Sequence, residues 1–156
     1  MKCLIVGCIC FLTGITAGII YIIYRAGYLV EKSQIEAEKY KTYFQMLNQL
    51  YAIRNGEKPW KNLQSYGTVG IYGKGILGSR LMEILEMNDV QVKFVMDQSD
   101  AAFYSNKPVY RATDQLPLVD AVIVTPAFEF EKIRGTILQG NPGANVVNIT
   151  ELLQKQ

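Results

Sequence analysis

The chain has 156 residues, which is enough for one domain and an additional element. Its 16 basic and 14 acidic residues give a formal net charge of +2, and this balance disfavours a nucleic-acid partner, which would require a clustered basic face. The sequence contains no histidine, which removes the commonest general base and excludes Ser-His-Asp and Cys-His catalytic sites.

The three cysteines, Cys3, Cys8 and Cys10, lie near the N-terminus inside an apolar run. Since the rest of the chain has none, we expect no disulfide framework and no metal site in the folded part. A cysteine in apolar surroundings usually acts as an inert small hydrophobe, and palmitoylation of one of the three is the alternative.

The first predicted element is a membrane-spanning helix, the anchor, assigned to residues 1–27. Residues 3–24 carry no charge and would rise about 33 Å as a helix, enough to cross a hydrocarbon core of about 30 Å. Tyr21, Tyr24 and Tyr28 at its C-terminal end suit the aromatic belt of a membrane surface. The length of the apolar run and its bulky end disfavour a cleaved signal peptide.

Flanking charge predicts the orientation of this helix. Only Lys2 precedes the apolar run, whereas four basic residues follow it: Arg25, Lys32, Lys39 and Lys41. The positive-inside rule therefore predicts a single-pass protein of the cell membrane whose C-terminal part is cytoplasmic. Gly14 and Gly18 have the small-residue spacing that allows two membrane helices to approach closely, so a homodimer through this face is one expectation.

Residues 28–58 predict an amphipathic helical stem and linker, with a stop at Asn55-Gly56. Its apolar face is assigned to Ile35, Tyr40, Tyr43, Phe44, Leu47, Leu50 and Tyr51. We expect this face to dock on the following domain or on a membrane-associated protein partner, and Trp60 and Leu63 to continue the packing. A short coiled coil is less consistent with the aromatic residues on this face. A helix lying on the membrane surface is less consistent with the balanced charges of the stem.

Residues 59–156 read as alternating strands and helices. Strands are expected at 68–72, 90–97, 120–125 and 144–149 with a short extended piece at 107–110, and helices at 76–87, 128–138 and 151–156. This alternation predicts an α/β fold, a small Rossmann-like domain with a parallel sheet and right-handed crossovers.

A glycine turn joins the first strand of this domain to its first helix. Gly73, Gly75 and Gly78 have the G-x-G-x-x-G spacing, in which the first makes a tight turn, the second admits a phosphate and the third allows close packing. Asp97 ends the next strand, where an acidic residue binds ribose hydroxyls in dinucleotide-binding folds. It predicts a preference for an unphosphorylated ribose. The alternative is a turn that serves packing alone.

Three further residues complete the predicted binding set. Lys74 and Ile76 flank Gly75 in the turn, and the Lys74 side chain could reach a phosphate or simply be solvated. Thr125 ends the third long strand, at the edge where α/β sheets bind ligands, so it is a candidate contact. An equally weighted alternative makes Thr125 the N-cap of the following helix.

Four stretches carry a resemblance to a known family: IYGKGILGSRLMEIL, VKFVMD, KPVYRATDQLPLVDAVIVT and NVVNITELL. Together they resemble the NAD(P)-binding Rossmann-like domain of bacterial surface-polysaccharide and nucleotide-sugar proteins, over residues 60–156. The resemblance implies NAD or a related nucleotide as ligand, held at Gly73, Gly75, Gly78 and Asp97. Larger members of the group attach a catalytic domain that is not recognised in this sequence, so the resemblance implies no activity.

These patterns favour a membrane-anchored nucleotide-binding module that acts as a sensing or accessory subunit, in polysaccharide biosynthesis if the resemblance holds. No catalytic residue is assigned, because the sequence offers no plausible acid–base pair. An enzyme of nucleotide-sugar chemistry completed by a partner, a degenerate scaffold that binds nothing, and a regulator of a transporter remain the alternatives.

Overall fold

The computed structural model describes residues 2–57, 66–98 and 106–154, and side chains from Thr16 onward. Its first element is one continuous helix, α1 (Lys2–Arg54). The chain forms two compact units, Met1–Thr42 and Tyr43–Gln156, and α1 contributes to both. Trp60 and Leu63 lie outside the described residues.

The first unit consists of helix α1 up to Thr42. Its described apolar side chains are exposed, including all six residues from Ile19 to Tyr24. No helix among the residues that the structure describes contains a stretch long and apolar enough to cross a membrane. Most of the predicted anchor, including Gly14 and the three cysteines, falls where the side chains lie outside the description.

The second unit is built on a five-stranded sheet with the order β3-β2-β1-β4-β5, in which every neighbouring pair is parallel. The strands are β1 (Thr68–Tyr72), β2 (Gln91–Met96), β3 (Val109–Tyr110), β4 (Ala121–Val124) and β5 (Val146–Asn148). The prediction of an α/β fold with a parallel sheet is confirmed. All four residues of β4 are buried, as expected for a central strand covered on both faces.

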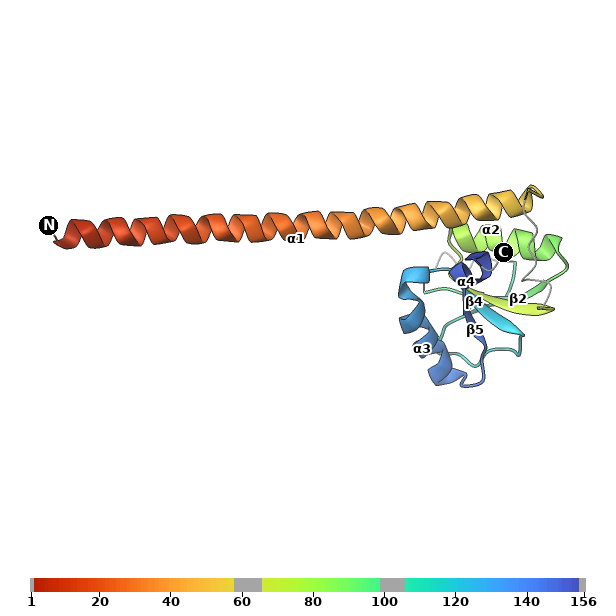
Figure 1. Ribbon diagram of the computed structural model, residues 1–156. Coiled ribbons are helices and arrows are strands. Elements are labelled where there is room, and N and C mark those ends of the chain that lie inside the picture. Colours follow the sequence, from red (N-terminus) through yellow and green to blue (C-terminus); the bar gives the residue numbers. More distant parts are fainter. Residues whose placement is uncertain (1, 58–65, 99–105, 155–156) are drawn as a thin grey trace. The chain divides into compact units, whose positions relative to one another are not determined.

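Helices cover both faces of the sheet (Figure 1). The end of α1, α2 (Ile76–Met87) and α4 (Ile149–Gln154) pack on one face, around Ile71, Leu81 and Ile123. Helix α3 (Phe130–Gly140) covers the other face, where Ile133 and Ile137 pack with Phe94. The chain leaves β1 and β4 on opposite faces of the sheet.

The last three turns of α1 belong to this core. Met46, Leu50 and Ile53 are at most 7% exposed and join the cluster beneath α2. Of the predicted stem, only the part from Tyr43 onward therefore packs on the domain that follows. The assigned face was partly wrong, because Tyr40 and Phe44 are 75% and 61% exposed. Aromatic residues occur on several sides of this helix, so helical spacing alone could not select the buried side.

Polar contacts also join the end of α1 to α2 at the protein surface. The Arg80 guanidinium lies 5.2 Å from the centre of the Tyr51 ring and bonds Glu83 at 2.7 Å, while Arg54 approaches Glu83 at 3.8 Å. Helix α1 then ends as predicted, because Gly56 has φ +75° and its N–H donates to the Ile53 carbonyl.

The element boundaries follow the predictions with local differences. A 3-10 turn, η3 (Ala127–Glu129), precedes α3, and Pro126 stands at its N-cap, where the missing N–H of proline costs no helical hydrogen bond. The last strand is shorter than predicted, since Ile149 already begins α4.

Candidate functional site

Five of the predicted binding residues meet at the carboxyl ends of β1, β2 and β4: Gly73, Lys74, Gly75, Asp97 and Thr125. We call this group the carboxyl-edge site. It lies where the chain leaves β1 and β4 in opposite directions, and these two strands are direct neighbours in the sheet. The site therefore combines the end of two central strands with the beginning of α2.

Two of the three glycines are required by the fold. Gly73 has φ +91°, a conformation that other residues rarely adopt, and an added Cβ would lie 2.6 Å from the Thr125 hydroxyl oxygen. At Gly78 an added Cβ would overlap the carbonyl oxygen of Gly73. The turn therefore packs helix α2 directly against the end of β1, with backbone touching backbone.

Gly75 has no such role. It is the N-cap of α2, with φ −58° and ψ −170°, and an added Cβ would meet no atom within 4 Å. No side chain caps α2, and its first turn contains no acidic residue. Because the first N–H groups of a helix lack partners within it, this exposed start favours negative charge. Serine, threonine, aspartate or asparagine would also fit here without a clash, and glycine is itself a common N-cap that leaves the helix N–H groups without a side-chain partner.

Asp97 follows β2, and its side chain contacts the glycine turn. Its Oδ2 accepts a 2.7 Å hydrogen bond from the backbone N–H of Lys74, and the N–H of Gly73 donates to the Met96 carbonyl at 2.8 Å. The end of β2 is thus joined to the turn at two adjacent residues. The carboxylate is held beside the beginning of α2 by backbone geometry.

Arg111 was not predicted to belong to this region. Its Nη1 donates a 2.8 Å hydrogen bond to the Asp97 carbonyl, which places a guanidinium beside the carboxyl end of β2. Arg111 directly follows β3, and β3 pairs in parallel with β2. The sequence showed a basic residue immediately after a short extended segment. Only the pairing of β3 with β2 shows that this residue lies beside Asp97.

Thr125 is 5% exposed, and its hydroxyl lies 3.1 Å from the Tyr72 carbonyl oxygen and 3.0 Å from that of Gly73. The one hydroxyl hydrogen is shared by these acceptors, while the backbone N–H also donates to Tyr72. Thr125 is not a helix N-cap, because Pro126 holds that position before η3 and no side chain caps it. It instead fastens the loop after β4 to the glycine turn.

Tyr72 completes the environment of the site and was not predicted. It is the last residue of β1 and is 6% exposed, on the face covered by α3. Burial raises the pKa of the Tyr72 phenol, and the negative charges of Asp97 and Glu129 raise it further. A hydrogen bond with Gln98 lowers this pKa by a smaller amount. The phenol is therefore neutral at physiological pH. Ile76, the remaining predicted contact, is 62% exposed at the start of α2.

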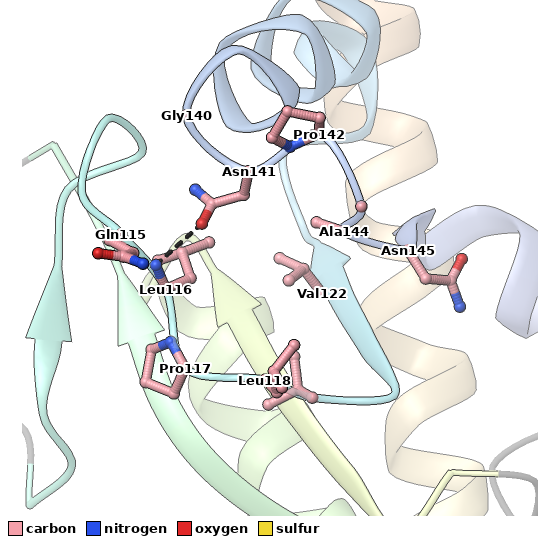
Figure 2. A pocket seen from close by; sticks show the side chains of 12 residues that line it. Gln115, Leu116, Pro117, Leu118, Val122, Gly140, Asn141, Pro142, Ala144 and Asn145 are labelled. Carbon is pink, nitrogen blue, oxygen red and sulfur yellow. Dashed lines mark hydrogen bonds between the residues drawn. The ribbon is translucent and has the colours of Figure 1, made fainter.

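A separate cavity of about 460 Å³ lies at the opposite edge of the sheet, at the amino ends of β4 and β5. Figure 2 shows Leu116 and Pro117 on one side of it and Pro142 and Ala144 on the other. The Asn141 side chain joins these sides: it accepts from the Leu116 N–H and donates to the Asp114 carbonyl, both at 2.9 Å. None of the predicted binding residues lines this cavity.

The carboxyl-edge site offers helix N–H groups that no side chain caps, one fixed carboxylate and an adjacent guanidinium. Such an arrangement can bind a phosphate and a hydroxyl-bearing group side by side. Within the described ranges, no three cysteine, aspartate or glutamate side chains come together in a group that could hold a metal ion.

No protein-family model, no curated protein and no solved structure matches this chain. The family resemblance is thus carried by its sequence motifs alone.

Proposed function

We propose that the second unit is a Rossmann-like module that binds a nucleotide, NAD or a close relative, at the carboxyl-edge site. The observation that carries this proposal is Gly75. Packing explains Gly73 and Gly78, but the space around Gly75 is open and its dihedral angles suit a residue with a side chain. A glycine there keeps the first N–H groups of α2 accessible, which a bound phosphate requires.

The topology supports the same reading. The strand order β3-β2-β1-β4-β5 matches the first five strands of the doubly wound dinucleotide-binding sheet. In open parallel sheets, ligands bind where neighbouring strands send their connections to opposite faces, which in this chain is the boundary between β1 and β4. The carboxyl-edge site lies at this boundary.

Asp97 supplies the second recognition element in this proposal. Its Oδ2 is fixed by the Lys74 N–H, and a carboxylate in that position can accept hydrogen bonds from ribose hydroxyls. A 2′-phosphate would meet the same negative charge, so we expect NAD to bind more tightly than NADP. Arg111 lies beside Asp97, and its guanidinium charge weakens this discrimination.

We further propose that the chain is a membrane-anchored sensing or accessory subunit. The residues from Ile19 to Tyr24 surround the helix with apolar side chains that are all more than half exposed. A helix that is apolar on all sides needs a protein or lipid environment. A role in bacterial cell-envelope polysaccharide synthesis rests on the family resemblance, and a nucleotide-sugar enzyme completed by a partner is the second candidate.

The proposal is tested by thermal unfolding of the full chain in a nonionic detergent, with NAD, NADP, NADH, UDP-glucose, ATP and coenzyme A. A ligand at about 100 times its dissociation constant stabilises the folded state by about 2.7 kcal/mol. For a domain of this size the melting temperature would rise by roughly 10 °C or more. We expect that rise with NAD, and a folded protein that responds to none of these nucleotides would contradict the proposal.

A further inference from the structure

The carboxyl-edge site has a second side, formed by the loop that follows β4. Thr125 begins this loop, and its hydroxyl and backbone N–H are bonded to the carbonyl groups at the end of β1. Glu129 ends η3 four residues later, and its N–H donates to the Pro126 carbonyl at 3.0 Å. The position of Glu129 is therefore tied to the glycine turn through a short, bonded segment.

The charges around the end of β1 are unevenly distributed. Tyr72 is buried there, and Asp97, at the end of β2, and Glu129, in η3 after β4, are close enough for their charges to act on its phenol. Both carboxylates raise the pKa of the Tyr72 phenol, and no basic group among the described residues acts on it. Of the basic residues at this edge, Arg111 bonds the Asp97 carbonyl on the β2 side, and Lys74 lies in the glycine turn.

A dinucleotide held at this site would have its two halves on different sides. With its phosphates at Gly75 and one ribose at Asp97, the other half extends over the end of β4 toward Glu129. The Glu129 side chain is exposed and makes no hydrogen bond or salt bridge within the described residues. Its charge is thus available to that second half.

We infer that Glu129 is a specificity-determining residue of the carboxyl-edge site and favours a ligand whose second half is positively charged over an otherwise similar neutral one. This inference rests on the proposed function. For a nicotinamide dinucleotide it means preference for NAD⁺, whose ring is cationic, over NADH, whose ring is neutral. A module of this kind would report the oxidation state of the nicotinamide pool.

The test compares NAD⁺ and NADH binding to the full chain by isothermal titration calorimetry in a nonionic detergent. We expect NAD⁺ to bind about three- to fivefold more tightly, the effect of one solvated charge pair. Glu129→Gln should bring the two affinities within a factor of about two. The matched control is Glu131→Gln, which removes the same charge two residues later from a glutamate paired with Arg134, and should preserve the preference.

Each other outcome overturns a defined part of the reasoning. Equal affinities in the unmodified protein, or a preference for NADH, would refute charge selection while leaving nucleotide binding intact. Equal weakening of both ligands by Glu129→Gln would make Glu129 a general contact and refute its role in selection. Failure of both dinucleotides to bind would remove the proposed NAD-like ligand, and the inference with it.

Discussion

Substitution of Gly75 by aspartate should change stability and ligand binding in opposite directions. The position is the N-cap of α2, its dihedral angles accept a side chain, and nothing lies within 4 Å of an added Cβ. Aspartate is among the best N-cap residues and exceeds glycine there by a few tenths of a kcal/mol. Removing a glycine also lowers the entropy of the unfolded chain, a gain of about 0.4–1 kcal/mol.

The combined gain is about 0.7–1.3 kcal/mol, which corresponds to a rise of roughly 3–10 °C in the melting temperature of a domain this size. The same carboxylate would occupy the space beside the helix N–H groups and repel a phosphate. We therefore expect Gly75→Asp to melt higher than the unmodified protein and to lose the stabilisation by NAD. Circular dichroism at increasing temperature, with and without the nucleotide, measures both effects.

Two controls separate the causes. Gly135→Asp introduces the same charge at another glycine whose added Cβ meets nothing, in α3, and should leave the NAD response intact. Gly75→Ser supplies a capping side chain without the charge and should retain part of the response. If Gly75→Asp binds NAD as well as the unmodified protein does, the phosphate does not lie at α2 and the reasoning about Gly75 fails.

Three further predictions concern the fold. Gly78→Ala should cost about 3 kcal/mol or more, since its Cβ would overlap the Gly73 carbonyl; an unchanged unfolding midpoint in urea would contradict the packing described. Leu50→Ala should cost about 2–5 kcal/mol while Phe44→Ala costs under about 0.5 kcal/mol, because only the former is buried; equal effects would show that α1 is not part of the core. Asp120 accepts hydrogen bonds from the backbone N–H groups of Thr68 and Gly67, and these bonds lower the pKa of its carboxyl group. The carboxylate therefore stabilises the fold at a pH above its unfolded-state pKa, and this stabilisation is lost as the pH falls through its folded-state pKa. Asp120→Ala should make the melting temperature fall less steeply in acid, and an unaltered pH profile would refute the assignment.

The sequence predicted this domain well where local chemistry and tertiary packing agree. The glycine turn, the apolar strand before it and the spacing of Leu77, Leu81 and Leu85 all indicate one strand–turn–helix unit, and the structure contains it. Asp97 could be placed at the turn because carboxyl ends of paired parallel strands share an edge. Both inferences depend on short-range patterns and a general rule of parallel sheets.

The remaining parts of the site depend on contacts that no local pattern encodes. Arg111 reaches the site only because β3 pairs with β2, and β3 has two residues, too few for its register to be read from alternation. Thr125 was expected either to cap a helix or to contact a ligand; the first expectation is wrong, because its hydroxyl bonds the carbonyl groups of Tyr72 and Gly73 and Pro126 holds the N-cap position. The buried face of α1 was similarly ambiguous, because Tyr40, Phe44, Leu47 and Leu50 all follow one another at helical spacings of three or four residues.

The two edges of the sheet are unusually short, with two residues in β3 and three in β5. An exposed edge strand offers unpaired N–H and C=O groups to which another chain can add a strand, and long flat edges promote aggregation for this reason. These short edges provide little room for such pairing. A partner, or a second copy of the chain, would accordingly be recognised by side chains on the helices and loops instead of by extension of the sheet.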